Sequence, residues 1–171
     1  MDFTKVICGR ESIRSYDPTK PLDKEVLGRI LDAGRIAPSA ANRQPWRFVV
    51  VSSREGLTHV RRCYNRPWFQ DAPHVLVVTG KTGEAWSRQD GWNSIETDVA
   101  IALDHMILAA ENEGVGTCWI AAYELSALRS AIGLASDERV YAITPLGYPK
   151  PGFSKKGQKQ RKTLGEVVRY L

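Results

Sequence analysis

The stretch SIETDVAIALDHMILAAENEGVGTCWIAAY, residues 94–123, carries the strongest fold signal in the sequence. Its apolar residues recur at helical spacing, which predicts one long helix with a single buried face formed by Ile95, Val99, Leu103, Met106, Ile107 and Ala110. Ser94 is a suitable cap for its start, and Gly114 and Gly116 break it. The apolar run TCWIAAY then predicts a strand.

Shorter elements are predicted on both sides of this stretch. Helices are expected around Phe3–Ile7, after the N-cap Asp23, weakly between Ser53 and Arg62, and over Leu125–Ile132. Strands are expected around Phe48–Val51, in HVLVVTG and in VYAITPLGY, and the final LGEVVRYL is predicted as a short strand or helix. No repeat or domain boundary is visible. Residues 1–171 are therefore predicted to form one α+β domain, a mixed β-sheet flanked by helices.

The positive charge of the chain is concentrated near its end. The formal net charge is +5, and KPGFSKKGQKQRK, residues 150–162, holds six cations and no acid. The rest of the chain therefore has a net charge of −1. This pattern predicts a local anion site or a solvated tail rather than a broad nucleic-acid surface. Phe153 alone supplies aromatic character there, which is too little for a base-stacking platform.

Several other classes of protein are disfavoured. The N-terminus lacks the apolar run of a signal peptide, and no window approaches the roughly 18 apolar residues of a membrane span. The three cysteines, Cys8, Cys63 and Cys118, form no CxxC pair and are expected to be small buried side chains. A reducing cytoplasm is the expected location, with no membrane and no nucleic acid as partner.

Common catalytic and ligand motifs are also missing or incomplete. GVGTCW has only two glycines of a dinucleotide fingerprint and follows a helix rather than a strand. GFSKKGQK lacks the Lys-Ser/Thr pair of a phosphate loop, and no GxSxG motif occurs. The three histidines are isolated, so no metal site is expected. No side chain is predicted to be catalytic.

The connection APSAANRQPW, residues 37–46, is unusually long and polar. Helix-to-strand connections usually take about 2 to 6 residues. This one contains two prolines together with hydroxyl and amide groups. One interpretation is an ordinary turn whose amides bond their own backbone. The other is a stiff, prepared wall of a binding site.

Five separated segments of the chain decide between these interpretations. They are RESIR (10–14), PSAANRQPW (38–46), YNRPWFQDAP (64–73), AAENEGVGTCWIAAY (109–123) and KQRKTLGEVV (159–168). In this order and spacing the set resembles the FMN-dependent nitroreductase family, over nearly the whole chain. The resemblance implies a homodimer with two FMN sites, each built across the subunit interface.

The resemblance also implies roles for the cations. Arg10 and Ser12 correspond to family positions near the FMN phosphate and ribityl chain, and Lys159 and Arg161 to a pair that closes on the same phosphate. A dianionic phosphate suits guanidinium and hydroxyl donors. Arg14 corresponds to a cation near the N1 and C2-carbonyl edge of the ring, where reduction places negative charge. Lys155 and Lys156 have no implied role.

The remaining implied contacts come from two subunits. Asn65 corresponds to a same-subunit contact with the flavin. Ala121 and Ala122 fall where relatives offer backbone N–H groups to the flavin N5 edge; relatives often carry glycine or an acid there, but only main-chain donors are needed. Some relatives add a lysine where this chain has Trp68. The partner subunit would supply Pro38, Ser39, Ala40, Asn42 and Gln44.

The activity implied is ping-pong reduction. NADH or NADPH would give hydride to FMN, and a nitroaromatic, quinone or related conjugated acceptor would then take two electrons in the same pocket. Trp86 and Trp92 could stack on a flat acceptor, or could instead pack in the core or the dimer interface. The alternatives are a specialised flavoenzyme of the same fold, of the dehalogenase or flavin-consuming type, and a non-catalytic FMN-binding protein.

Overall fold

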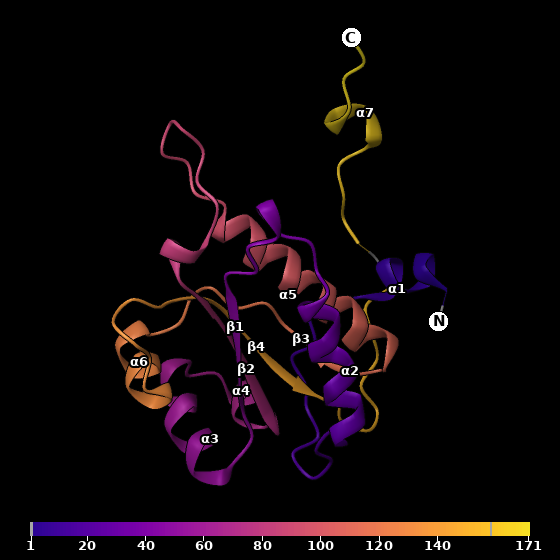
Figure 1. Cartoon of the computed structure of the whole chain (residues 1–171). Helices are drawn as coiled ribbons and strands as arrows, with labels where there is room; N and C mark the ends of the chain where they lie inside the picture. The colour runs from indigo at the N-terminus through magenta and orange to yellow at the C-terminus, as the bar shows by residue number, and fades with distance from the viewer. Residues whose placement is uncertain (1, 158) are drawn as a thin grey trace.

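The computed structural model describes residues 2–157 and 159–171, and its centre is a four-stranded sheet. The strands are β1 (Trp46–Val51), β2 (His74–Gly80), β3 (Gly116–Thr117) and β4 (Arg139–Gly147), in the order β1-β2-β4-β3 (Figure 1). Every pairing between these strands is antiparallel. The expected mixed character is limited, among the described residues, to one isolated parallel bridge between Ser12 and Thr117.

Helices cover both faces of the sheet, as Figure 1 shows. Strand β2 is buried along its whole length, and its side chains alternate between two cores. Leu76 and Val78 pack with α2 (Lys24–Arg35) and α5 (Ile95–Asn112). Val75 and Val77 pack with α3 (Arg54–Val60) and α6 (Leu125–Ile132) on the other face. The α+β prediction, with helices flanking a sheet, is confirmed.

The long helix α5 confirms the strongest sequence signal. Its predicted buried face is buried throughout, and Gly114 follows its end with a positive φ of 72°. Ser94 occupies the N-cap position without bonding a backbone N–H of the helix, because its Oγ donates instead to Asp98 Oδ2 at 2.7 Å. The opposite face is also rich in apolar side chains, and Ala100, Ile101 and Leu108 are only partly covered.

The strand predicted in TCWIAAY is much shorter in the structure. Only Gly116 and Thr117 pair with β4, opposite Gly147 and Leu146. The backbone then leaves the ladder, since Cys118 N donates to the side-chain Oγ1 of Thr144 at 3.0 Å. Ile120 returns to form an isolated bridge with Ile143. The apolar run therefore marks burial beside the sheet rather than continuous pairing.

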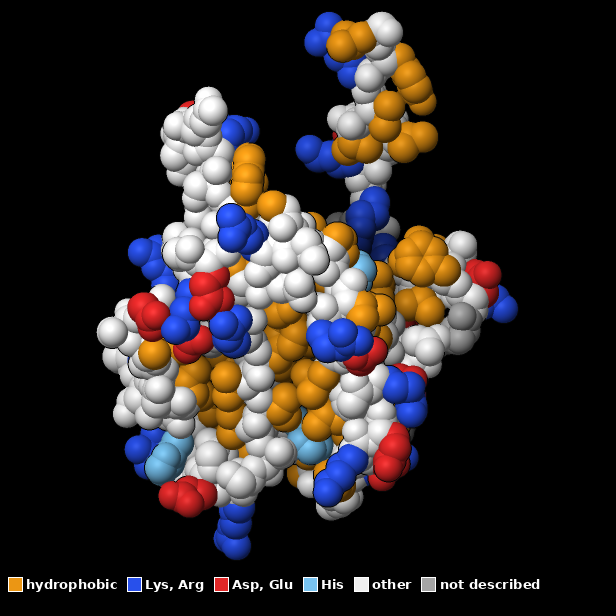
Figure 2. Space-filling model, viewed as in Figure 1, with side chains coloured by type: hydrophobic (Ala, Val, Ile, Leu, Met, Phe, Trp, Pro, Cys, Tyr) orange, Lys and Arg blue, Asp and Glu red, His pale blue; other side chains and the backbone are white. Residues whose placement is uncertain are grey.

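Both ends of the chain form short helices. Helix α1 (Phe3–Gly9) is confirmed, and Asp2 caps it by accepting hydrogen bonds from the backbone of Thr4 and Lys5. The segment after β4, residues 150–157 and 159–171 of the described chain, is here called the tail. Its last part, which contains helix α7 (Leu164–Val167), projects from the body (Figure 1). Figure 2 shows apolar side chains along this tail beside lysine and arginine side chains. The tail therefore exposes apolar surface away from the core.

The predictions about the cysteines, a metal site and a membrane span can be compared with the structure. The three cysteines are free, and Cys63 and Cys118 are buried as expected, but Cys8 is exposed because it lies on the outer side of α1. Within the described ranges, no group of histidine, cysteine and acidic side chains is placed to hold a metal ion. None of the described helices is both long and apolar enough to cross a bilayer.

Candidate functional site

The segment Arg10–Arg14 runs beside β3 in a fixed register. Ile13 N donates to Thr117 O at 2.7 Å, and the side chain of Ile13 is 1% exposed. Gly116 makes this approach possible, because a Cβ there would lie 2.8 Å from Ile13 Cγ2. Side chains alternate along an extended chain. Burial of Ile13 therefore directs its neighbours Ser12 and Arg14 away from the core.

Tyr16 fixes the same segment from beneath. Its ring is fully buried, and its hydroxyl donates to the carbonyl of Ile13 at 2.6 Å. Burial raises the pKa of Tyr16 well above its ordinary value, with a smaller contribution from Cys118. The phenol therefore keeps its proton and remains a hydrogen-bond donor.

The basic part of the tail meets this segment around a large cavity, here called the cationic cavity. Its volume is about 810 Å³. It is lined by Arg10, Glu11, Ser12, Arg14, Phe153, Ser154, Lys156, Lys159, Gln160 and Arg161. Among these described residues are five cations and a single acid. The structure thus brings together five of the predicted site residues: Arg10, Ser12, Arg14, Lys159 and Arg161.

Two lysines of the tail are bonded to the end of α1. Lys159 Nζ donates to Ile7 O at 2.9 Å, and Lys155 Nζ donates to Gly9 O at 3.0 Å. The last carbonyls of a helix have no partner within the helix, and cations are favoured there. These bonds hold the tail next to Arg10, the residue that follows α1.

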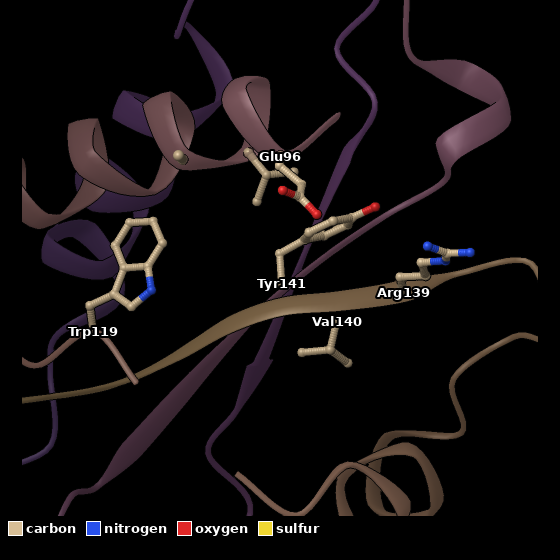
Figure 3. Close-up of a pocket in the computed structure, with 7 residues that line it drawn as sticks. Glu96, Trp119, Arg139, Val140 and Tyr141 are labelled. Atoms are coloured by element: carbon tan, nitrogen blue, oxygen red, sulfur yellow. The ribbon is translucent and has the colours of Figure 1, made fainter. Parts of the chain in front are cut away.

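The cationic cavity continues along α5. A hollow of about 210 Å³ shares Arg10 and Ser12 with it and extends to Asp104, Ile107, Thr117 and Trp119. A further hollow of about 430 Å³ shares Trp119 and is lined by Glu96, Val99, Ala100, Arg139, Val140 and Tyr141. Figure 3 shows Trp119 on one side of this hollow and Arg139 on the other, with Glu96 and Tyr141 between them. The cationic cavity therefore adjoins the first hollow at Arg10 and Ser12, and the two hollows adjoin each other at Trp119. The two hollows, which are lined in part by α5, are here called the groove.

Sequence reasoning did not select the groove residues Trp119, Arg139 and Tyr141. Trp119 is 41% exposed although it follows buried Cys118. It belongs to the GxGTCWI turn that supports the family resemblance, so an aromatic residue there could have been recognised as a site candidate. Arg139 and Tyr141 lie at the start of β4, and no sequence pattern marks them.

Arg14 lies against an aromatic cluster, with Trp68 at the position where some relatives carry a lysine. Its guanidinium carbon lies 6.0 Å from the ring centroid of Trp68. Trp68 in turn contacts Tyr16, Tyr64 and Phe69. A cation over an indole face is attracted by the ring quadrupole. Trp68 therefore restricts where the Arg14 charge can lie.

Cys118 lies near the same cation. Burial raises the pKa of the Cys118 thiol, and Arg14 opposes this rise only in part. A buried, protonated thiol is a poor nucleophile and packs as a small apolar side chain. The residue therefore has the structural role expected from the sequence.

The loop Pro38–Gln44 lies at the other end of α5, outside the cationic cavity of its own chain. Ala40 N donates to Asp98 Oδ1 at 2.9 Å, which ties the loop to the start of the helix. Gln44 bonds within the loop, to Ser39 Oγ and Asn42 Oδ1. Ala41, Asn42 and Gln44 all have φ near 50°, a left-handed conformation that costs non-glycine residues energy. Such strain often occurs at functional sites.

The other predicted positions lie apart from the cationic cavity. Asn65 is exposed and lines a separate hollow of about 400 Å³ with Thr58, Arg61, Arg62 and Gln70. Ala121 and Ala122 are exposed just beyond the Ile120–Ile143 bridge. The roles of these residues in binding stay predictions.

Trp86 and Trp92 lie on a loop that projects between η3 (Thr82–Glu84) and α5, as Figure 1 shows. A bridge between Ser87 and Asn93 joins the two sides of the loop. The two indoles meet edge to face, with centroids 6.2 Å apart, and Arg88 lies over Trp92. The prediction that these tryptophans pack in the core is wrong, since both are partly exposed in the single chain, and packing in a dimer interface stays a prediction.

Comparisons with a family model and with known proteins point to the same family. A family model described as "Nitroreductase family" matches residues 7–62 and 54–148. A protein of Archaeoglobus fulgidus, named as a proposed NADH dehydrogenase/NAD(P)H nitroreductase, is 32% identical over 85% of this chain and 84% of its own length. An iodotyrosine deiodinase of Thermotoga neapolitana is 24% identical over 82% of this chain and 84% of its own length.

Solved structures agree with the fold. A nitroreductase family protein of Clostridium difficile 630 has a TM-score of 0.90 and 31% identity, covering 99% of this chain and 98% of its own. A proposed nitroreductase of Exiguobacterium sibiricum 255-15, solved in complex with FMN, has a TM-score of 0.85 at 22% identity, over 100% and 98% of the two chains. The chain therefore belongs to the nitroreductase family and is a flavin-dependent oxidoreductase.

Proposed function

We propose that this protein binds FMN and uses NADH or NADPH to reduce nitroaromatics, quinones or related conjugated acceptors by two electrons. The observation that carries the proposal is the cationic cavity, which places five cations around the fixed Arg10–Arg14 segment in a chain of this family. The name of the Archaeoglobus relative supports NAD(P)H as donor, and the Exiguobacterium complex supports FMN as cofactor.

The residues that line the cationic cavity fit the phosphate end of FMN. A phosphate monoester carries about two negative charges at neutral pH and offers oxygen acceptors only. The cations outnumber the acid five to one among the described lining residues, and Ser12 adds a hydroxyl donor. Arg10, Ser12, Lys159 and Arg161 would hold the phosphate. Arginine suits this task because its planar fork of donors matches phosphate oxygens.

The groove between the cationic cavity and Trp119 would receive the rest of the cofactor. Bound FMN supplies two-electron redox chemistry by accepting and passing on hydride. The chain contributes position and charge: Arg14, held against Trp68, would present a fixed cation to the pyrimidine edge of the ring. Ala121 and Ala122 would offer backbone N–H groups, and Asn65 an amide. We assign no side chain as a catalytic acid, because water can supply protons.

We further propose that the working form is a homodimer. Helix α5, which helps to line the groove, also carries Ala100, Ile101 and Leu108, whose side chains are only partly covered in the single chain. The projecting tail exposes Leu164, Val167 and Tyr170, and apolar surface of this kind is typical of an interaction site. A second copy would cover these surfaces. Its strained loop would add Pro38, Ser39, Ala40, Asn42 and Gln44 as the opposite wall of each flavin pocket.

The choice of acceptor would depend on the loop that carries Trp86 and Trp92. The iodotyrosine deiodinase relative supports reductive dehalogenation as a second candidate function. The connection between β2 and α5, residues 81–94, includes η3 and the Trp86–Trp92 loop, so it leaves little further chain for an added substrate lid. We therefore favour reduction of open-access acceptors such as quinones and nitroaromatics.

Steady-state kinetics tests the proposal. The FMN-loaded protein should oxidise NADH or NADPH in the presence of a quinone or a nitroaromatic. Double-reciprocal plots at several acceptor concentrations should be parallel, because donor and acceptor would use one pocket in turn. A faster reaction with an iodinated phenol than with either acceptor would favour the dehalogenase. Bound FMN without turnover of any acceptor would leave only the binding function.

A further inference from the structure

An acidic side chain lines the cationic cavity, where it should repel the phosphate expected there. This residue is Glu11, which lies between Arg10 and Ser12. Its carboxylate accepts hydrogen bonds from two successive backbone N–H groups of the tail, from Lys156 N at 3.1 Å and Gly157 N at 2.8 Å. Gly157 adopts a positive φ of 73°, which aims successive N–H groups at one anion. Glu11 thus binds the tail.

Glu11 remains charged while it does so. The bond from Gly157 N lowers the pKa of its carboxyl, and the bond from Lys156 N and the charges of Lys155 and Lys159 act in the same direction. Desolvation opposes them without reversing the shift. The carboxylate is therefore a permanent acceptor for the tail at neutral pH.

A second tie lies one residue earlier in the tail. The ammonium of Lys155 pairs with the carboxylate of Glu111, near the end of α5, and also donates to Gly9 O at 3.0 Å. The side chain of Glu111 is only 10% exposed, so this pair is much less open to water than most surface ion pairs. The tail is thus fastened to α5 and α1 at Lys155 and to the Arg10–Arg14 segment at Gly157.

We propose that Glu11 and Lys155 form a latch that positions Lys159 and Arg161 beside Arg10 and Ser12 before FMN arrives. Both are positioning residues, and the inference rests on the proposed function, namely that the FMN phosphate binds in this cavity. Binding energy is lost when a mobile segment must be ordered at the moment of binding. A latched tail has its cations in place already.

The direction in which FMN affinity changes when Glu11 is removed distinguishes a latch from a simple negative charge. If Glu11 acted only through its negative charge, its removal would strengthen FMN binding, because a repulsion beside the phosphate would disappear. If Glu11 latches the tail, its removal weakens FMN binding, because the segment that carries Lys159 and Arg161 is then held only by the bonds of Lys155 and Lys159 to α1 and of Lys155 to Glu111. Glu11→Ala therefore gives opposite results under the two interpretations.

The latch itself is tested without cofactor, by hydrogen–deuterium exchange of the full-length apoprotein. Glu11→Ala and Lys155→Met should raise exchange in peptides that contain Lys155–Gly157 and Lys159–Arg161. Lys150→Met is the matched control, because it breaks the exposed ion pair with Asp71 in the same part of the chain. The double variant Lys155→Met/Glu111→Gln avoids an unpaired buried carboxylate, so it keeps the test valid if the single variant is unstable. Unchanged exchange in all of these variants would overturn the latch.

The consequence for the cofactor is tested by titrating FMN and riboflavin separately. Loss of positioned phosphate contacts should weaken FMN binding by about tenfold in Glu11→Ala and Lys155→Met, equivalent to one charge-assisted hydrogen bond. Riboflavin lacks the phosphate, so its affinity should stay within about twofold of the wild-type value, and Lys150→Met should match wild type for both ligands. Equal or tighter FMN binding by Glu11→Ala would overturn the positioning role. Failure of the wild-type protein to bind FMN would instead refute the proposed function, and with it that role.

Discussion

Replacement of Ile13 by alanine should damage both stability and the cofactor site. The side chain is 1% exposed and lies against Gly116, and its backbone N–H fixes the register with Thr117. The change removes three carbons, which at about 0.8 kcal/mol each corresponds to about 2.4 kcal/mol of lost transfer free energy. A partly retained cavity adds to this loss, so the free energy of unfolding should fall by about 3 kcal/mol. The free energy of unfolding of natural domains is about 5–15 kcal/mol, so the variant should still fold.

Urea denaturation of the apoprotein, followed by circular dichroism, measures this change. Leu125→Ala is the control, because it removes the same number of carbons from a side chain that is 46% exposed, and it should cost below about 1 kcal/mol. Ile13→Ala should also bind FMN more weakly than the control, since Ser12 and Arg14 lose their support. A loss below about 1 kcal/mol together with unchanged FMN affinity would refute the role given to Ile13.

Three further predictions concern other parts of the molecule. Burial lowers the pKa of His74, whose Nε2 accepts Leu22 N at 3.0 Å, so the unfolded chain binds a proton more readily than the folded one. Stability linked to His74 is therefore present above the unfolded pKa of about 6.5 and is lost as the pH falls below it. The midpoint temperature of thermal unfolding should decrease when the pH is lowered from 7 to 5.5, and this decrease should be smaller in His74→Gln. An equal decrease in the variant would exclude His74 as its source. Deletion of residues 164–171 should shift the protein toward monomer in sedimentation velocity, whereas a fully dimeric deletion variant would exclude the tail from the interface. Trp92→Ala should change the ratio of quinone to nitroaromatic turnover, and an unaltered ratio would remove Trp92 from acceptor choice.

The elements that the sequence predicts well are those whose periodicity and end signals agree. Helix α6 begins and ends where Leu125–Ile132 was predicted, and α5 is closed by glycine. The strand in TCWIAAY was overextended because an apolar run reports burial, whereas pairing needs a partner in register. Only Gly116 and Thr117 have such partners on β4 before the side chain of Thr144 takes the next bond.

The site residues were predictable where buried and exposed side chains alternate along an extended segment. In RESIR, burial of Ile13 explains the spacing of Ser12 and Arg14, and these residues share a cavity with Lys159 and Arg161. Other features depend on contacts between distant segments. The bonds from Lys155 to Gly9 and Glu111 join residues that no local pattern relates. The left-handed conformation of Gln44 likewise occurs in a loop that is bonded to α5 through Ala40 and Asp98, a contact that sequence spacing does not encode.

The most direct measurement is the absorption spectrum of the purified protein after addition of FMN and desalting. The proposed function predicts retained flavin bands, with about one FMN per chain, that bleach on addition of NADH or NADPH under argon and return with a quinone. A protein that stays colourless after desalting, with its fold intact by circular dichroism, would contradict the assignment of the cationic cavity as an FMN phosphate site.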